Sequence, residues 1–480
     1  MNKLPPARVL VPLIVACALF MENLDATVLS TALPAIASDL HESPIQLKLA
    51  LTSYLLTLAV FIPASGWLAD RFGTRSVFRI AVAVFALGSV LCGVSTSIGT
   101  LVAARALQGV GGAMMVPIGR LVVLRTVSKA ELVGALAWLT MPALIGPILG
   151  PPLGGFVTTY FSWRWIFWIN IPMAVLGLVL ATLFIPDVRG ETKSRFDFVG
   201  FLLSGIGLCS FVSGSAAFGA NALPPIAAIS LLGVGVLFLL FYVFHARRTE
   251  VPILDLNLLR FSTFRALVIG GSLFRISIGA TPLLMPLLLQ IGFGMSPLKS
   301  GLLTFGTAIG ALGMKPAARS LLRWFGFRTT LLANTVISSL LTAVPALFTA
   351  KTPEIYLLLV MFLGGFFRSL QFTSINSMGY AEIEQREMSQ ATSFSSVVQQ
   401  VSLSIGVTIG ASILETTLAI HGHTNLRASD FPPAFLIVGF LTLLSFFGFA
   451  TLPPDAGAEM AGRVPAVTAE GEMPATREPS

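Results

Sequence analysis

The chain has 480 residues, of which 55% are hydrophobic and 11% are charged, whereas an average soluble domain carries roughly 25% charged residues. The formal net charge is +8, but the basic residues stand in short segments between apolar blocks, which argues against a nucleic-acid partner. Many of these blocks are about twenty residues long, enough to cross a hydrocarbon layer of about 30 Å. The composition therefore excludes a soluble domain and predicts an all-α integral membrane protein, since a membrane barrel would show short alternating segments instead.

The cysteines and histidines give no pattern of a metal or disulfide site. Cys17, Cys92 and Cys209 all lie within apolar blocks, and their spacing fits neither a disulfide framework nor a metal site. His421 and His423 could ligate a metal ion weakly, but solvated loop residues are the preferred interpretation. We therefore predict no metal site.

Taken in order, the apolar blocks predict fourteen membrane-spanning helices. They are Val9–Leu33, Gln46–Ala69, Arg79–Ile98, Leu101–Leu124, Val133–Thr158, Ile166–Phe184, Phe198–Phe218, Pro224–Phe244, Phe264–Ile291, Ser300–Ala318, Thr329–Phe348, Ile355–Met378, Ala391–Leu418 and Pro433–Leu452. Residues 453–480 are rich in Ala, Pro, Glu and Thr, so we expect a disordered cytoplasmic tail.

The Lys and Arg residues predict how these spans are oriented, because such residues are enriched in cytoplasmic links. With the N-terminus inside, most of them fall in cytoplasmic links. Few fall in outer links: Lys48, Arg164, Lys299, Lys351 and Arg427. This bias predicts that both termini are cytoplasmic.

The first span contains two carboxyl groups, Glu22 and Asp25, which are three residues apart and so share nearly one helix face. Because they interrupt the first apolar run, we do not expect a cleaved signal peptide. Ionisable groups within a membrane usually face an internal cavity and serve function. Desolvation raises the pKa of a buried carboxyl group and a nearby guanidinium lowers it, so either residue could exchange a proton near neutral pH.

The fourth span contains Arg105, whose guanidinium keeps its charge at any physiological pH. Placing this charge near the bilayer centre costs about 2.5–3.5 kcal/mol on insertion scales. Nothing within the span neutralises it, and the nearest acidic candidates are Glu22 and Asp25. We expect a charge pair between helices; the alternative is an arginine that snorkels from a helix end.

The link between the second and third spans is rich in glycine and charge: Gly66-Trp-Leu-Ala-Asp70-Arg71-Phe-Gly73-Thr-Arg75. Gly66 and Gly73 permit tight turning and close helix approach. Asp70 among basic residues can pair charges across helix ends, and such a cluster could latch one conformation. The alternative is an ordinary basic loop.

Part of this link recurs. Phe-Gly-x-Arg appears again as Phe325-Gly326-Phe-Arg328 after the tenth span. Two like-oriented halves are typical of transporters built from parallel repeats. We therefore predict six-helix bundles over residues 1–190 and 263–452, with an inserted helix pair and linker over residues 191–262.

The fifth span combines regularly spaced glycines with prolines: Gly146-Pro147-Ile-Leu-Gly150-Pro151-Pro152-Leu-Gly154-Gly155. Glycines four residues apart share one helix face and permit close packing. The prolines remove backbone donors and are expected to bend the helix. A bent, glycine-faced helix suits a sliding contact, and a static packing helix is the alternative.

Other polar residues fall within later spans. Arg275 lies in the ninth span, Arg368 in the twelfth, and Gln400 in the thirteenth. Glu415 lies near the outer end of the thirteenth span. We expect these four residues around a central cavity, with an interfacial position as the alternative for Glu415.

In combination these motifs resemble the major facilitator superfamily. Gly66–Arg75 resembles its loop signature, Arg105–Gly112 its fourth-span motif implicated in proton transfer, and Gly146–Gly155 its fifth-span antiporter motif. Leu24–Pro34 and Ser162–Pro172 resemble the fourteen-span drug:proton antiporters of the EmrB/QacA type. Within that group the pattern is most similar to the MdtD type, which also fits Arg275 and Gln400–Thr408.

The resemblance implies two six-helix bundles around a central cavity, alternating access, and export coupled to proton entry. Asp25 would be the protonatable and substrate-sensing carboxylate, and Arg105, with Gln108 in the same motif, would assist proton transfer. Asp70 with Arg71 would gate the cytoplasmic side. Arg323 stands where the second half should mirror Asp70, so symmetric gating is not expected.

We therefore predict a monomeric antiporter of the bacterial inner membrane that exports lipophilic compounds, cationic ones included, in exchange for protons and without another cofactor. A proton symporter or facilitator for a metabolite on the same fold is the alternative, and the fifth-span motif argues against it. An enzyme is not expected, because the chain has no phosphate loop and no soluble catalytic domain. A sensor would need a sizeable extramembrane domain.

Overall fold

The computed structural model describes residues 7–126, 132–187, 196–217, 224–384 and 387–457. Within these ranges the chain forms helices joined by turns, and no strand occurs. A long apolar helix satisfies its own backbone hydrogen bonds, as hydrocarbon requires of any segment that crosses it. The all-helical class expected from the composition is confirmed.

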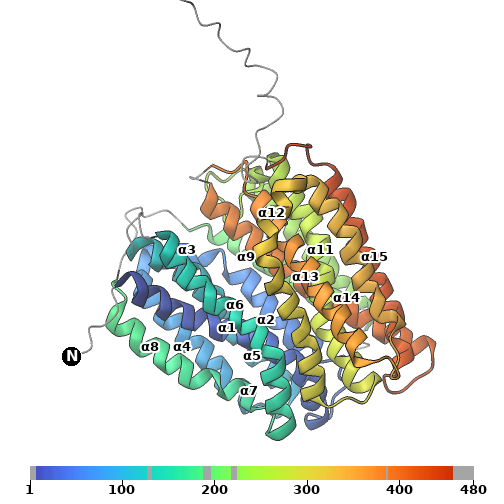
Figure 1. Cartoon of the computed structure of the whole chain (residues 1–480). Coiled ribbons are helices and arrows are strands. Elements are labelled where there is room, and N and C mark those ends of the chain that lie inside the picture. Colours follow the sequence, from blue (N-terminus) through green and yellow to red (C-terminus); the bar gives the residue numbers. More distant parts are fainter. Residues whose placement is uncertain (1–6, 127–131, 188–195, 218–223, 385–386, 458–480) are drawn as a thin grey trace, which may run out of the picture.

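The helices of the first third of the chain pack against one another on one side of the molecule (Figure 1). They are α1 (Ala7–Asp39), α2 (Lys48–Phe61), α3 (Ala64–Phe72), α4 (Thr74–Gly93), α5 (Ile98–Thr126), α6 (Leu132–Tyr160), α7 (Trp165–Trp168) and α8 (Asn170–Phe184). The predicted second span is bent: α2 and α3 meet at 57°. Pro63 stands at this break, where its missing N–H interrupts the helical ladder.

The helices of the last part of the chain form a second packed group. They are α11 (Ser262–Leu287), α12 (Pro297–Ala343), α13 (Glu354–Met378), α14 (Met388–Ile420) and α15 (Pro432–Ala450), with the short helices η1 (Leu256–Arg260), η2 (Leu288–Gly292), η3 (Val344–Leu347) and η4 (Ala428–Asp430). The long helix α12 consists of two limbs, because Gly326 has non-helical backbone angles.

Between the two groups the chain forms a helix pair, α9 (Phe198–Ala217) and α10 (Pro225–Ala246). These helices pack along each other, and α9 also contacts α2 and α14, one helix from each group. Ile226 and Phe244 of α10 are 76% and 62% exposed, as expected of side chains that face lipid. The predicted domain boundary at residue 190 and the tail beyond residue 457 lie outside the described residues.

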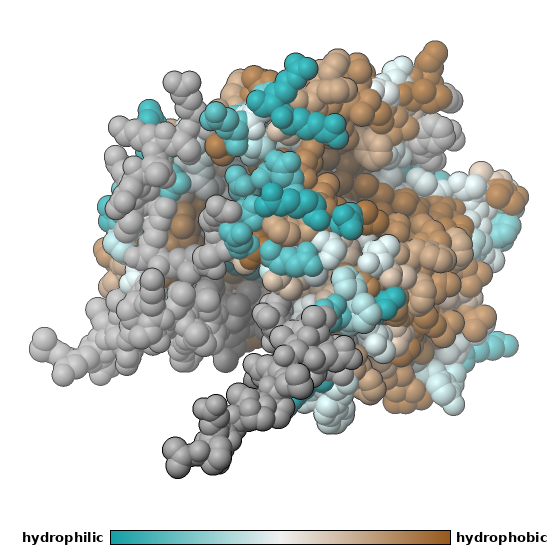
Figure 2. All heavy atoms as spheres, turned by 90° about the horizontal axis from the view of Figure 1, so that it is seen from above, coloured by the Kyte–Doolittle hydropathy of each residue, from teal (hydrophilic) through white to brown (hydrophobic). Residues whose placement is uncertain are grey.

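Eleven of the described helices are long and apolar enough to cross a bilayer, and the bent pair α2 and α3 makes twelve. The other two predicted spans correspond to α6 and to the limb of α12 before Gly326. Neither segment is among these twelve candidate spans. Figure 2 looks down on one end of the helices, where hydrophilic side chains gather on the end face and apolar side chains cover a flank. The multi-pass architecture is therefore confirmed, and the total of fourteen spans and the six-helix bundles remain predictions.

The buried apolar residues show how the two groups meet. We call the end where α1 stops and α2 begins the Asp39 end, and the end where α3 meets α4 the Arg71 end. Near the Asp39 end one cluster joins both groups and includes Leu33 of α1 and Leu414 of α14. Toward the Arg71 end the core divides in two, around Phe78 and around Phe449. The groups are therefore packed together most continuously at the Asp39 end.

Candidate transport site

The two central charges predicted to pair lie on different helices of the first group. Asp25 of α1 and Arg105 of α5 are each only 1% exposed. Arg105 Nη1 donates to Asp25 Oδ2 at 2.5 Å. A buried guanidinium needs such a partner, because an unpaired charge in a low-dielectric interior is costly. The structure thus brings these residues together, as the sequence predicts.

Three neutral polar residues complete the environment of Asp25. Its Oδ1 accepts hydrogen bonds from Gln108 Nε2 at 2.9 Å and from Asn170 Nδ2 at 2.8 Å. Gln108 Oε1 accepts from Arg105 Nη1 at 2.6 Å, and both carboxamides donate to Ser89 Oγ. With three donors, the negative charge of Asp25 is well stabilised. We call these five residues the Asp25 network.

Sequence reasoning missed two members of this network, Ser89 of α4 and Asn170 at the start of α8. Asn170 entered the sequence analysis only as part of a segment that resembles a family. The available signal was a carboxamide inside an otherwise apolar helix, since such a group needs a partner there. The Oδ1 atom of Asn170 is buried and accepts no hydrogen bond from the described residues.

Arg105 also contacts α2. Its guanidinium carbon lies 4.3 Å from the centre of the Tyr54 ring, within the range of a cation–π interaction. Its Nε donates to the backbone oxygen of Ala50 at 3.4 Å. The charge therefore ties α5 to both α1 and α2.

Glu22 does not belong to the Asp25 network. It is 9% exposed, and its Oε2 is buried without a hydrogen-bond partner among the described residues. The two carboxyl groups in the middle of α1 therefore have opposite environments: Asp25 has three donors, and Glu22 has an oxygen that accepts no hydrogen bond from the described residues.

A cavity of about 380 Å³ lies between the two helix groups, within the usual size of small-molecule sites. From the first group it is lined by Ala26, Thr27 and Ser30 of α1 and by Pro147 and Pro151 of α6. The second group contributes residues of α11, α12, α13 and α15. The helix that carries Asp25 therefore also forms one wall of this cavity.

Of the four residues expected around a cavity, Arg368 of α13 lines it. The other three do not. Arg275 is completely buried and donates to Oδ1 of Asn376, a residue of α13, at 3.0 Å. Gln400 is half-buried but is not part of the lining. Glu415 accepts from Lys48 Nζ at 2.9 Å, near the Asp39 end.

The glycines of α6 pack against two different helices. Gly146, Gly150 and Gly154 face α1, where a Cβ atom on Gly154 would lie 2.5 Å from the backbone oxygen of Val28. Gly155 faces the other helix group, where a Cβ atom would lie 2.9 Å from Leu298 Cα. The predicted close-packing face is confirmed, and α6 continues through its prolines as one helix. Two of these prolines line the cavity, and the glycines contact α1 and α12. Helix α6 therefore lies against α1, α12 and the cavity.

The loop motif is divided between two helices. Gly66, Asp70 and Arg71 lie on α3, and Arg75 lies on α4. Gly73 joins the helices with φ +92°, and a Cβ atom there would collide with the Asp187 carboxylate. Gly66 differs from the prediction: it lies inside α3, with no atom within 4 Å of the position of a Cβ. The tight turn and close approach therefore belong to Gly73 alone.

The recurring Phe-Gly-x-Arg has the same backbone feature in both copies. Gly73 has φ +92° and ψ 141°, and Gly326 has φ +75° and ψ 169°. Both glycines stand between two helical limbs, in a region that is essentially restricted to glycine. The following arginines, Arg75 and Arg328, each have a buried Nε without a partner among the described residues. The short sequence repeat thus marks a structural repeat.

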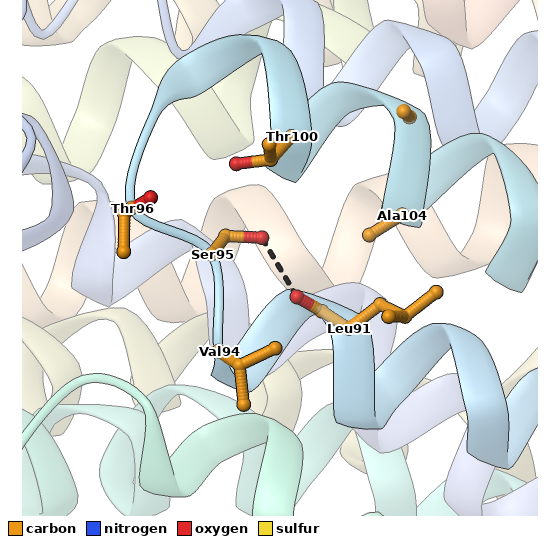
Figure 3. Close-up of a pocket in the computed structure, with 7 residues that line it drawn as sticks. Leu91, Val94, Ser95, Thr96, Thr100 and Ala104 are labelled. Atoms are coloured by element: carbon orange, nitrogen blue, oxygen red, sulfur yellow. Dashed lines mark hydrogen bonds between the residues drawn. The ribbon is translucent and has the colours of Figure 1, made fainter.

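A second pocket, of about 340 Å³, lies where α4 meets α5 (Figure 3). It is lined by Leu91, Val94 and neighbouring small residues, and Ser95 Oγ donates to the Leu91 backbone oxygen at 2.7 Å. Because none of the described residues that line it is charged, we assign it no part in the site.

These observations agree with the comparison to known families. The Major Facilitator Superfamily model matches residues 15–262 and 267–468. The chain belongs to this superfamily. As a major facilitator protein it is a membrane transporter and not an enzyme.

Several proteins of similar sequence share a name. The chain is 39% identical over 451 residues to the "Putative multidrug resistance protein MdtD" of Shigella sonnei (strain Ss046), with 93% of this chain and 95% of that protein covered. It is 38% identical over the same length and coverage to the protein of that name in Escherichia coli O157:H7 (strain EC4115 / EHEC). The predicted MdtD-type membership is therefore confirmed.

Solved structures show the same fold. A human organic anion transporter, MFSD10 (TETRAN), matches with a TM-score of 0.57 and 16% identity, over 93% of this chain and all of that chain. The nucleoside transporter NupG matches with a TM-score of 0.59 and 12% identity, over 93% of this chain and 98% of that chain. At these identities the likeness concerns the major facilitator fold alone.

Proposed function

We propose that this transporter exports small lipophilic molecules in exchange for protons by alternating access. One observation carries the proposal: α1 holds the buried Asp25–Arg105 pair, and the adjoining Ala26, Thr27 and Ser30 line the cavity between the helix groups. Protonation in this part of α1 can therefore alter packing directly beside the substrate. Each ligand then biases the equilibrium between the two access states by its differential affinity for them.

Glu22 is the better proton carrier of the two carboxyl groups. Asp25 is held by Arg105, Gln108 and Asn170, so protonating it breaks charge-assisted hydrogen bonds. Glu22 has a buried oxygen without a hydrogen-bond partner in the described part of the chain, and an unpaired buried charge is costly. In this proposal Glu22 exchanges the proton, and Asp25 senses that exchange from one helical turn away.

The packing of the two helix groups supports a conformation in which one end of the cavity is closed. The helix groups meet continuously at the Asp39 end, where Lys48 of α2 pairs with Glu415 of α14 and Gln290 Nε2 donates to the Thr31 backbone oxygen at 2.9 Å. If both termini are cytoplasmic, this end faces outward and the structure is closed to the outside. We propose the bacterial inner membrane as its location, with protons as the coupling ion and the monomer as the working unit.

The proton gradient supplies enough free energy for this exchange. One elementary charge moving through 100 mV releases about 2.3 kcal/mol, and each pH unit adds about 1.4 kcal/mol. One proton can therefore sustain a substrate gradient of roughly a hundredfold or more.

The proposal can be tested with the purified full chain in proteoliposomes. A panel of cationic, neutral and anionic aromatic dyes is offered under an imposed pH gradient, with and without an uncoupler. We expect dye to move opposite to the protons and the movement to stop when the uncoupler is added. Dye movement in the same direction as protons would indicate a symporter, and movement indifferent to the uncoupler would indicate a facilitator.

A further inference from the structure

Arg368 brings a positive charge to the cavity between the helix groups. It is half-buried on α13, and it is the one charged side chain among the described residues that line the cavity. Its Nη2 donates to Thr281 Oγ1, another lining residue, at 3.2 Å. A guanidinium has five N–H donors and no acceptor, so most of its hydrogen-bonding capacity remains available.

The two fully buried arginines of the helix groups do not line the cavity. Arg105 pairs with the carboxylate of Asp25, and Arg275 donates to the neutral Asn376. Around Arg368, which does line the cavity, no carboxylate of the described residues lies within 4.0 Å of a guanidinium nitrogen. A charge that is half-buried without a counter-charge is costly unless a ligand supplies one.

The rest of the lining suits a molecule with one polar end. Among the other lining residues, Thr281 and Thr304 carry hydroxyl groups, and Met285, Met361 and Phe435 offer apolar surface. Arginine binds planar anionic groups with two parallel hydrogen bonds, which gives geometric as well as electrostatic selectivity. Methionine side chains adapt to varied apolar shapes.

We propose that the transported substrates are amphipathic organic anions, carboxylates or sulfonates on an apolar body, and that Arg368 binds their anionic group. This inference rests on the proposed transport function and narrows its substrate class. It runs against the cationic compounds included in the sequence-based prediction, because the described residues of the lining include no acidic side chain. The negative charge of Asp25 is already balanced by Arg105, and Glu22 is not part of the lining.

Three probes of one shape separate charge from size: naphthalene-2-carboxylate, the neutral naphthalene-2-carboxamide and naphthalen-2-ylmethylammonium. Equilibrium binding of each probe to the purified full chain is measured by competition against the same probe in radiolabelled form. Transport is measured separately in proteoliposomes. The variants are Arg368→Gln, Arg368→Lys and the charge reversal Arg368→Glu. Monodispersity in detergent and retained binding of the carboxamide show that each variant is folded.

We expect the wild type to bind the carboxylate at least about tenfold more tightly than the ammonium, as a charge-assisted contact predicts. Arg368→Gln should remove this preference and leave carboxamide binding within about twofold, and Arg368→Lys should keep part of it. Arg368→Glu should reverse it. Tighter binding of the ammonium to the wild type, no binding of the carboxylate, or an unchanged preference in Arg368→Gln would overturn the proposal. Selective binding without proton-driven flux would instead count against the proposed function alone.

Discussion

At the scale of single residues, the carboxyl groups of Glu22 and Asp25 lie one helical turn apart and have different neighbours, which is why we propose different roles for them. Charge alone predicted that Arg105 would find a partner in α1, because an isolated guanidinium is too costly within a membrane. The neutral members Ser89 and Asn170 could not be predicted in the same way. Many hydroxyl groups in these helices merely bond to their own backbone, as Thr27 Oγ1 does to the Asn23 oxygen at 2.9 Å.

Changing Glu22 tests which carboxyl group carries the proton. In Glu22→Gln the side chain keeps its shape but cannot be ionised, so gradient-driven export should be lost. Exchange of labelled for unlabelled substrate across the membrane needs no net proton movement and should persist. Both fluxes are measured in the same proteoliposomes, with Glu22→Asp as the variant that keeps a titratable group. Full gradient-driven export by Glu22→Gln would assign the proton to another residue.

Changing Asn170 tests the network around Asp25. Asn170→Ala removes one of three donors to a buried carboxylate, which should lower the free energy of unfolding by about 1–3 kcal/mol. The midpoint of thermal unfolding in detergent should fall, and more than in Asn23→Ala, which removes only a hydrogen bond to the Leu19 backbone oxygen and leaves the Asp25 network intact. An unchanged midpoint would show that Asn170 adds nothing to the stability of this site.

At the scale of elements, periodic spacing predicted the contacts of α6 better than any other feature. Glycines at intervals of four define one helix face whatever the partner is, and that face indeed meets α1. The sequence could not show that Gly155 would meet α12, because a contact between distant segments depends on the whole fold. The role assigned to Gly66 was wrong for a related reason: glycine permits a turn but does not require one.

Adding a methyl group to α6 tests this contact. In Gly154→Ala the new Cβ meets the backbone oxygen of Val28 at 2.5 Å, so α1 and α6 must separate. We expect at least a tenfold loss of transport and a lower unfolding midpoint, because backbone cannot move aside as a side chain can. Gly177→Ala on α8 is the matched control, since nothing lies within 4 Å of its Cβ position. Equal behaviour of the two variants would contradict this packing.

The two glycines of the loop motif should differ in the same way. Gly73→Ala places a side chain at φ +92° and against Asp187, at a cost of about 1–3 kcal/mol for the backbone alone. Gly66→Ala lies in an open helical position, where alanine is favoured by up to about 1 kcal/mol. Unfolding midpoints in detergent should therefore move in opposite directions, and a shared direction would count against the placement of these glycines.

At the scale of the whole molecule, the two helix groups are packed together at the Asp39 end, which we propose is the closed end of the access cycle. The sequence predicted a multi-pass helical protein from block length, and a repeat from Phe-Gly-x-Arg. It could not predict which end would be closed, because that depends on contacts between residues hundreds of positions apart, such as Lys48 and Glu415. Glu415 was expected beside the cavity, with an interfacial position as the alternative, and it lies near the Asp39 end in the pair with Lys48.

The closed end can be locked. Leu298 N donates to Thr159 Oγ1 at 3.1 Å across the two helix groups, so cysteines at these positions should react with a short bifunctional thiol reagent. With Cys17, Cys92 and Cys209 replaced by serine, cross-linked Thr159→Cys/Leu298→Cys protein should stop transporting. Glu415→Gln leaves Lys48 buried without a counter-charge, so it should slow the cross-linking several-fold. Full transport by the cross-linked protein would contradict alternating access through this end.

The central claim is that buried charges beside the cavity couple substrate transport to proton movement. The variant Asp25→Asn tests this claim most directly. This variant keeps the size of the side chain and removes its charge, and its insertion into the membrane is checked by its yield and monodispersity. Substrate flux under an imposed pH gradient is then compared with that of the wild type. The account predicts that gradient-driven flux is abolished in correctly inserted Asp25→Asn protein, and a gradient-driven flux equal to that of the wild type would contradict it.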